Sequence, residues 1–385
     1  MPRYNPKTFT RPESLKRMDP VILLALLERF AEFFSDHGLD LEPLSTDQEL
    51  PYPQIAQLIA TPDDAPELAG ALYLIDEMAS EKRFDDLIER TQVYGLPEWW
   101  DEPTPADLAT FLWLRDPAAL QRLHASSYLD RQRRFTYFHD EPFDHLWSGP
   151  TGDEIATLEA ELADWFLRAK RGRGCRVFYF FRQDEHWFLV WHGQAYRREG
   201  SVVDGEPGTV VYRPEKYDIL GLHPERGEIK IHAATKNEVE LYREVMAHRV
   251  LGVESTFHVT DRYSLKPLQD LGPGALQCHD IPGIAWIKLR EVQLDWGGPE
   301  GEIEIRRAKD LFAAFAADGR ELPANVRVRS AKFGVAFRGG RRARSVVLRP
   351  PNVVHYTRDP DSVPIEDWLR KRGFYSGDGW ASGGR

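Results

Sequence analysis

Residues 176–181 read Arg-Val-Phe-Tyr-Phe-Phe, and here the spacing of apolar residues changes from a period of about 3.6 to a period of about 2. Before this segment, apolar residues recur at helical spacing. After it, short runs rich in β-branched and aromatic residues alternate with turn residues, which is typical of antiparallel strands. The sequence therefore predicts a multidomain α+β protein, with an all-helical N-terminal domain followed by antiparallel, β-rich α/β domains.

The N-terminal part contains three helix starts marked by proline. Asp19-Pro20, Thr104-Pro105 and Asp116-Pro117 each place a side-chain acceptor before a proline, whose missing N–H costs nothing at the first helical position. Thr104 and Asp107 also have the spacing of a capping box. The expected helices of this region and of the segment that follows it cover residues 20–37, 52–60, 66–79, 81–93, 105–115, 117–129 and 153–170.

The rest of the chain reads as strands interrupted by a few helices. A first group of strands is expected at 176–182, 186–192, 195–199, 209–213, 216–222 and 228–232, then a helix at 237–251 and a strand at 256–259. A strand–strand–helix order then occurs twice, at 284–295, 302–307 and 308–317, and at 325–337, 341–349 and 362–372. These tandem ββα units predict a small layered α/β domain.

Turn-rich segments give the expected domain boundaries. Ser148-Gly149-Pro150 ends the helical part, and a connector over 263–283 precedes the tandem units. We expect an acidic helical domain at 1–150, a β-sheet domain with flanking helices at 151–262, a tandem ββα domain at 263–374 and a disordered tail at 375–385.

Composition limits the class of protein. The 385 residues are 42% hydrophobic and 12% aromatic, which is enough apolar surface to fold. The longest apolar stretch, 21–27, is far shorter than the roughly 20 residues of a membrane span, and no secretory signal precedes it. Two cysteines are too few for a disulfide framework. We expect a cytoplasmic protein that does not contact membranes, and the 38 Arg against 12 Lys are typical of a GC-rich bacterial genome.

Charge is distributed unevenly along the chain. Residues 1–150 carry 14 basic and 27 acidic side chains, whereas residues 151–385 carry 36 and 34. Such asymmetry is typical of a domain that attracts a protein partner, or of one domain that shields another from anionic ligands. The alternative is a solvated surface that keeps the protein soluble.

Most enzyme signatures are absent, including the Walker A loop, the dinucleotide-binding glycine motif, the zinc-protease motif and the nucleophile elbow. One constellation remains: Asp218 on an expected strand, a turn at 224–227, then Glu228 and Lys230 on the next strand. This order resembles the core of PD-(D/E)XK nucleases. The resemblance implies that Asp218 and Glu228 hold Mg²⁺ and that Lys230 positions the attacking water.

The expected hairpin register qualifies that resemblance. Glu228 and Lys230 share a face by the two-residue period. Asp218, however, is expected to pair near Ala233, so that its carboxylate is separated from Glu228 by about the length of the strand. The alternative reading is that these are solvated strand charges. If the chain is not a nuclease, no cofactor is expected.

The strongest functional signal lies near the C-terminus. Residues 322–358 contain nine basic side chains and no acidic one, in a protein of net charge −11. With a two-residue turn at Gly339-Gly340, Phe333 opposes Val346 and Ala331 opposes Leu348, so that apolar residues share one face. The expected phosphate-contacting residues are Arg327, Arg329, Lys332, Arg338, Arg341, Arg342, Arg344 and Arg349.

Arg327 and Arg329 join the basic face only if a bulge near Ser330 corrects the alternation. A basic two-stranded ribbon suits a phosphate backbone, because the planar guanidinium matches phosphate oxygens. The resulting hypothesis is a nucleic-acid-associated protein, DNA or RNA, in a bacterial DNA-processing or anti-phage defence complex. The alternatives are a protein–protein adaptor that never contacts nucleic acid, and the metal-dependent nuclease.

Overall fold

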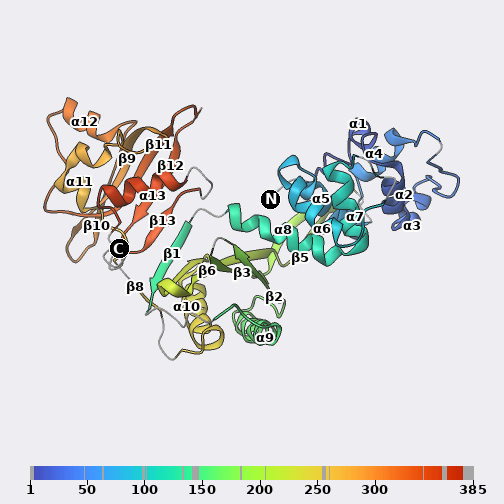
Figure 1. Ribbon diagram of the computed structural model, residues 1–385, viewed down its shortest axis with the longest axis horizontal. Coiled ribbons are helices and arrows are strands. Elements are labelled where there is room, and N and C mark those ends of the chain that lie inside the picture. Colours follow the sequence, from blue (N-terminus) through green and yellow to red (C-terminus); the bar gives the residue numbers. More distant parts are fainter. Residues whose placement is uncertain are drawn as a thin grey trace. The chain divides into compact units, whose positions relative to one another are not determined.

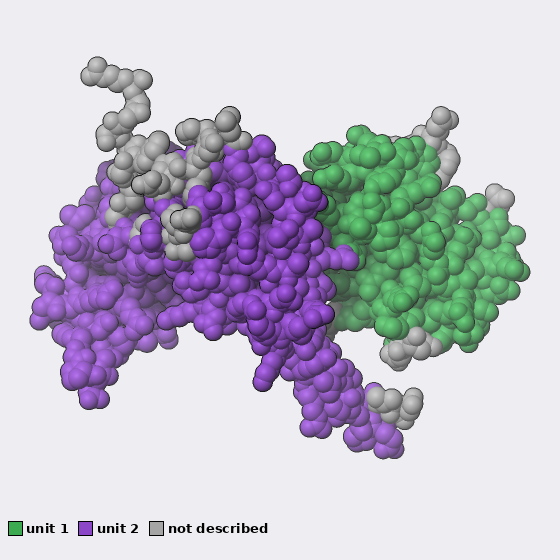
Figure 2. All heavy atoms as spheres, turned by 90° about the horizontal axis from the view of Figure 1, so that it is seen from below, with its two compact units in different colours: residues 1–127 green, residues 128–385 purple. Residues whose placement is uncertain are grey.

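The chain forms two compact units, residues 1–127 and 128–385, coloured separately in Figure 2. The computed structural model describes residues 4–46, 48–62, 65–97, 100, 102–131, 134–140, 147–182, 184–203, 205–253, 257–259, 261–340, 342–357 and 362–375. The coarse prediction of a mixed α+β protein with a large antiparallel sheet is confirmed. The predicted boundaries at residues 150 and 262 stay predictions.

The described secondary structure of the first unit consists of helices joined by loops. The three expected caps are present: Asp19 accepts hydrogen bonds from the backbone of Val21 and Ile22, Thr104 and Asp107 form a capping box, and Asp116 accepts from Ala119. The expected helix 20–37 is divided in two. The helices are α1 (Pro12–Leu15), α2 (Pro20–Glu28), α3 (Ala31–Asp36), α4 (Tyr52–Ala60), α5 (Pro66–Met78), η1 (Glu81–Arg83), α6 (Phe84–Gln92), α7 (Pro105–Arg115) and α8 (Pro117–Arg131), which runs into the second unit.

The second unit carries the described strands and the remaining helices (Figure 1). The strands are β1 (Arg134–His139), β2 (Cys175–Arg182), β3 (Glu185–Gly193), β4 (Arg197–Val203), β5 (Glu206–Tyr212), β6 (Glu215–His223), β7 (Glu228–His232), β8 (His258–Val259), β9 (Ile284–Gly297), β10 (Glu302–Arg307), β11 (Arg327–Phe337), β12 (Arg344–Arg349) and β13 (Val353–His355). The helices are α9 (Gly152–Arg168), η2 (Pro224–Arg226), α10 (Lys236–Val245), η3 (Met246–Val250), α11 (Lys266–Asp270), η4 (Gly272–Leu276), α12 (Leu311–Ala317) and α13 (Ser362–Lys371).

One large antiparallel sheet links nearly all these strands. Its order is β10-β9-β11-β12-β13-β1-β7-β6-β3-β2, with β8 paired to β1, while β4 and β5 form a separate ribbon. The sequence pattern missed β1 and β13, which join the two halves of the sheet. Because β1 pairs with strands on both sides, a segment of the expected helical domain lies inside the sheet, and residues 1–150 are not all helical.

Helices cover one face of each half of the sheet. In the C-terminal half, Phe333 of β11 packs against Trp368 of α13 and against Phe374, with ring centroids 5.1 and 5.5 Å apart. In the other half, α9 and α10 cover Phe188, Leu220 and their neighbours. Phe138 of β1 belongs to this second core. Phe135, three residues earlier on the same strand, points to the other face and pairs with the buried Val354. The two cores therefore lie on opposite faces of the sheet.

Two further findings concern the length of the helices and the expected C-terminal tail. Within the part of the chain that the structure describes, every helix is too short or too polar to cross a membrane. Of the expected tail, Tyr375 forms an isolated bridge with Tyr263, and the residues after it lie outside the described ranges.

Candidate nucleic-acid interface

The hairpin of β11 and β12 has the register that the sequence predicts. Ala331 pairs with Leu348 and Phe333 with Val346, and all four side chains are buried on the helix-covered face. The intervening Lys332 points to the other face, where it is exposed. The apolar residues of the hairpin therefore anchor it to the core and leave its basic residues in solvent.

A β-bulge brings Arg327 and Arg329 onto the exposed face. The pairing of β11 with β9 shifts between Val328 and Ser330, so that Arg329 is the extra residue. Val328 and Ser330 are buried, whereas the two arginines flanking Val328 are exposed. The bulge at the predicted position thus corrects the alternation and aligns both arginines with Lys332.

Six basic side chains of this hairpin are exposed and unpaired. None of them makes an ion pair or a side-chain hydrogen bond with another described residue. We call these six the basic face: Arg327, Arg329, Lys332, Arg338, Arg342 and Arg349. Arg344 is half-buried, with its guanidinium 5.1 Å from the centre of the Phe337 ring, and Arg341 lies outside the described residues.

The same surface continues onto β9. Lys288 pairs with Gly334 and Trp286 with Ala336. Arg290 crosses Gly334, where an added Cβ would come 2.8 Å from its Nε, so the glycine makes room for the guanidinium. Lys288 and Arg290 lie 5.4 and 5.7 Å from the Trp286 ring. Lys288 is ion-paired with Asp310 at 3.3 Å and Arg290 donates to the Lys309 carbonyl oxygen, so only Arg290 adds unneutralised charge to this part of the sheet.

Acidic groups near the basic face are few. Glu291 forms an ion pair with Arg307, whose Nε lies 2.6 Å from Glu291 Oε2. Burial of Glu291 opposes ionisation, but the hydrogen bond from Arg307 and the charge of Lys332 outweigh it and lower the pKa of this carboxyl. Asp295 lies opposite Arg327 without forming an ion pair with it. The surface therefore stays net positive.

The structure separates the three residues of the nuclease hypothesis. Gly221 pairs with Lys230 and His223 with Glu228, so both charged residues lie on the Gly221 face. Asp218 precedes Ile219, which pairs with His232, so Asp218 lies on the opposite face. Along the strands it is roughly 16 Å from Glu228. Glu228 and Lys230 do share a face, as predicted, but Asp218 and Glu228 are not placed to hold one Mg²⁺.

Glu228 and Lys230 have other partners. Lys230 Nζ lies 2.7 and 2.8 Å from the two carboxylate oxygens of Glu185 and 4.2 Å from the centre of the Trp187 ring. Glu228 forms an ion pair with Arg262, whose guanidinium is 3.9 Å from the Tyr137 ring. Both residues are thus engaged in pairs that hold strands and loops together.

Asp218 belongs to a buried polar cluster that the sequence did not reveal. His192 Nε2 and the Tyr242 hydroxyl contact its Oδ2 at 3.0 and 2.8 Å, and Lys216 Nζ lies 2.7 Å from its Oδ1. Burial next to the Asp218 carboxylate raises the pKa of Tyr242 well above its usual value, so the phenol donates. The cluster hydrogen-bonds Oδ2 of a carboxylate inside the core, while its Oδ1 is compensated by the charge of Lys216.

Glu238 shares Lys216 with Asp218. Its Oε1 lies 2.9 Å from Lys216 Nζ and also contacts Arg171, while its Oε2 accepts from Thr235 in a capping box. Burial opposes ionisation of Glu238, but the hydrogen bonds from Lys216 and Arg171 prevail and lower its pKa to about 2. Thr235-x-x-Glu238 is the one signal in the sequence that could have located this carboxylate.

This cluster could hold a metal ion, because ligand atoms of His192, Asp218 and Glu238 lie within 4.8 Å of one another. The ammonium of Lys216, however, already lies between the two carboxylates. Two carboxylates facing Lys216 and Arg171 are balanced in charge without a metal. The arrangement is therefore best described as a buried ion network.

Comparison of the sequence with known protein families and with curated proteins finds no match.

Proposed function

We propose that this chain binds the phosphate backbone of nucleic acid through the basic face of the β11–β12 hairpin. The observation that carries the proposal is the set of six exposed, unpaired cations on one hairpin of a protein whose net charge is −11. Unpaired arginines repel one another, and a polyanion relieves that repulsion while releasing its own counterions.

The contrast with neighbouring arginines supports this function. On β10, which is separated from the hairpin by β9, Arg306 and Arg307 are each neutralised by a glutamate, at 2.7 and 2.6 Å. The six cations of the basic face have no such partners among the described residues. Guanidinium groups left free on a rigid ribbon can contact phosphate oxygens in pairs without first breaking an internal ion pair.

The anchoring of the hairpin adds preorganisation. Its apolar face packs on Trp368 and Phe374, and its register to β9 is fixed by the bulge. Ordered side chains at known spacing lose less entropy on binding than those of a flexible basic tail. Binding of this kind reads charge and shape rather than base sequence.

The test is retardation of nucleic acid by the full chain at ~50 mM salt, where phosphate attraction is strong. Wild-type protein should retard at least one of duplex DNA, single-stranded DNA and RNA. Replacing Arg327, Arg329 and Arg349 with Ala should weaken binding about equally for unrelated sequences. Because these side chains are exposed and unpaired, the fold should be retained.

A matched control removes the same charge elsewhere. Arg29, Arg173 and Arg176 are also exposed, and their replacement with Ala should leave binding nearly unchanged. Failure of the folded wild type to retard any of the three nucleic acids would refute the proposal and favour the adaptor alternative. Equal losses in the two triple variants would show that net charge, not the basic face, is responsible. A protein partner for the acidic N-terminal part stays a prediction.

A further inference from the structure

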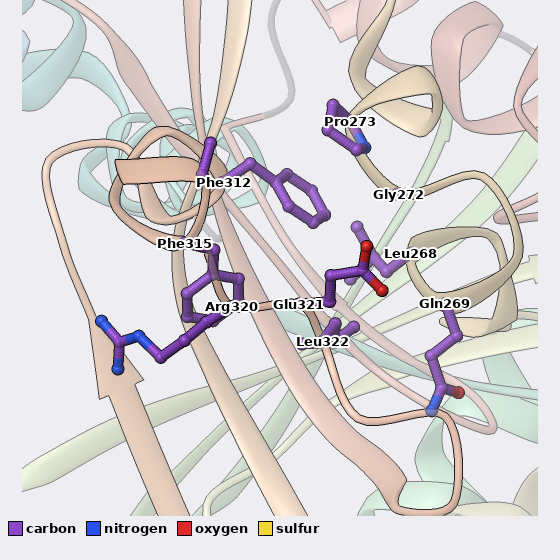
Figure 3. Close-up of a pocket in the computed structure, with 10 residues that line it drawn as sticks. Leu268, Gln269, Gly272, Pro273, Phe312, Phe315, Arg320, Glu321 and Leu322 are labelled. Atoms are coloured by element: carbon purple, nitrogen blue, oxygen red, sulfur yellow. The ribbon is translucent and has the colours of Figure 1, made fainter. Parts of the chain in front are cut away.

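A pocket of about 370 Å³ lies between α12 and the segment of α11 and η4 (Figure 3). Its apolar walls come from Leu268, Phe312, Phe315 and Leu322, and Pro273 lies at its rim. The volume is near the lower end of the roughly 300–1,000 Å³ that is usual for ligand sites, so the pocket suits a small molecule.

Contacts within the protein hold the pocket open. Gln269 Nε2 donates to the carbonyl oxygens of Pro323 and Val326, both at 2.8 Å, which fixes the segment that follows Leu322. Phe312 and Phe315 form an edge-to-face pair with ring centroids 6.4 Å apart. The apolar surface is thus preformed, which reduces the cost of ordering on binding.

The charges at the pocket differ in how they are used. Arg320 is ion-paired with Asp318, lies 5.6 Å from the Phe315 ring and points away from the hollow in Figure 3. Glu321 points into the hollow between Phe312 and Leu268, and makes no ion pair with another described residue. The pocket therefore offers an aromatic and aliphatic wall together with one free carboxylate.

We propose that this pocket binds a small organic cation in which a primary ammonium is attached by a short chain to an aromatic ring. The ring packs between Phe312 and Leu268, and the ammonium donates to the Glu321 carboxylate. The Glu321 carboxylate would repel an anionic ligand, and a neutral one would not form a charge-assisted hydrogen bond with it. This inference does not rest on nucleic-acid binding.

The experiment uses the full chain and three probes of similar size: 2-phenylethylammonium, 2-phenylethanol and 3-phenylpropionate. Calorimetry or ligand-observed NMR should show that the ammonium binds more tightly than the alcohol and that the carboxylate does not bind. Glu321→Gln should weaken ammonium binding roughly two- to fivefold, because an ion pair with an exposed carboxylate is lost, and leave alcohol binding unchanged.

Two variants of α12 locate the site. Ala316 lines the pocket, whereas Ala313 is exposed on the same helix outside it. Ala316→Trp should fill the hollow and abolish binding, and Ala313→Trp should preserve it. Absence of ammonium binding at millimolar concentration, equal binding of the alcohol, or insensitivity to both Glu321→Gln and Ala316→Trp would each overturn the proposal.

Discussion

Glu238 is the residue whose ionisation contributes most clearly to folding. Its folded pKa of about 2 lies below its ordinary value of 4.5, so the carboxylate stabilises the fold above pH ~4.5. That contribution is lost as the pH falls from ~4.5 towards 2, and it is on the order of 3 kcal/mol because each pKa unit is worth about 1.4 kcal/mol.

Denaturant unfolding followed between pH 7 and pH 2.5 tests this prediction. Glu238→Gln should lower the free energy of unfolding at pH 7, since Arg171 and Lys216 lose a buried partner, and should flatten the acid limb of the profile. Glu240→Gln, on the exposed side of the same helix, is the control and should change little. If the free energy of unfolding of Glu238→Gln fell as steeply with acid as that of the wild type, the ion network would be contradicted.

At the residue scale, the sequence predicted faces better than it predicted sites. The period of 2 placed Glu228 and Lys230 on one face, and the expected bulge aligned Arg327 and Arg329 with Lys332. The structure places Asp218 on the face opposite Glu228 and Lys230, because residues directly opposite in an antiparallel pair share a face. Ala233 points to the face opposite Glu228 and Lys230, so the expected pairing of Asp218 with Ala233 already placed Asp218 on that opposite face.

At the scale of elements, β1 is the strand that the sequence did not reveal. Its six residues follow a helix, carry no turn signal for a hairpin, and pair with β7 and β13, which are roughly 90 and 220 residues away in the chain. Local pattern carries no information about such distant pairing. By contrast, β7, β10, α4 and α7 have the predicted bounds, since caps and short turns are local.

Asn352 fixes the junction of β1 with the C-terminal half. Its side-chain Nδ2 donates to the Tyr137 carbonyl oxygen at 2.7 Å, and its own carbonyl accepts from the Tyr137 N–H at 3.0 Å. Asn352→Ala should lower the free energy of unfolding by about 1–3 kcal/mol, because the buried Tyr137 carbonyl loses its partner. The exposed Asn325→Ala is the control. Equal stability of both variants would show that this bond does not hold the junction.

At the scale of the whole molecule, the first unit has a core of its own. Among the described residues, its buried cluster runs from Phe9 to Leu123, all within residues 1–127. Residues 1–127 expressed alone should therefore give a helical circular dichroism spectrum and unfold cooperatively. A fragment of residues 1–150 should be less soluble, because it adds β1 without β7 and β13. Little helix in the shorter fragment would contradict this division.

The most direct test of the central claim is the salt dependence of nucleic-acid affinity, measured for wild type and for the triple variant Arg327→Ala, Arg329→Ala and Arg349→Ala. Each phosphate contact contributes about −0.9 to the log–log slope on duplex DNA, so the variant should have a slope smaller by roughly two to three. The control triple at Arg29, Arg173 and Arg176 should keep the wild-type slope. A variant that retains the wild-type slope would show that the basic face does not contact phosphates.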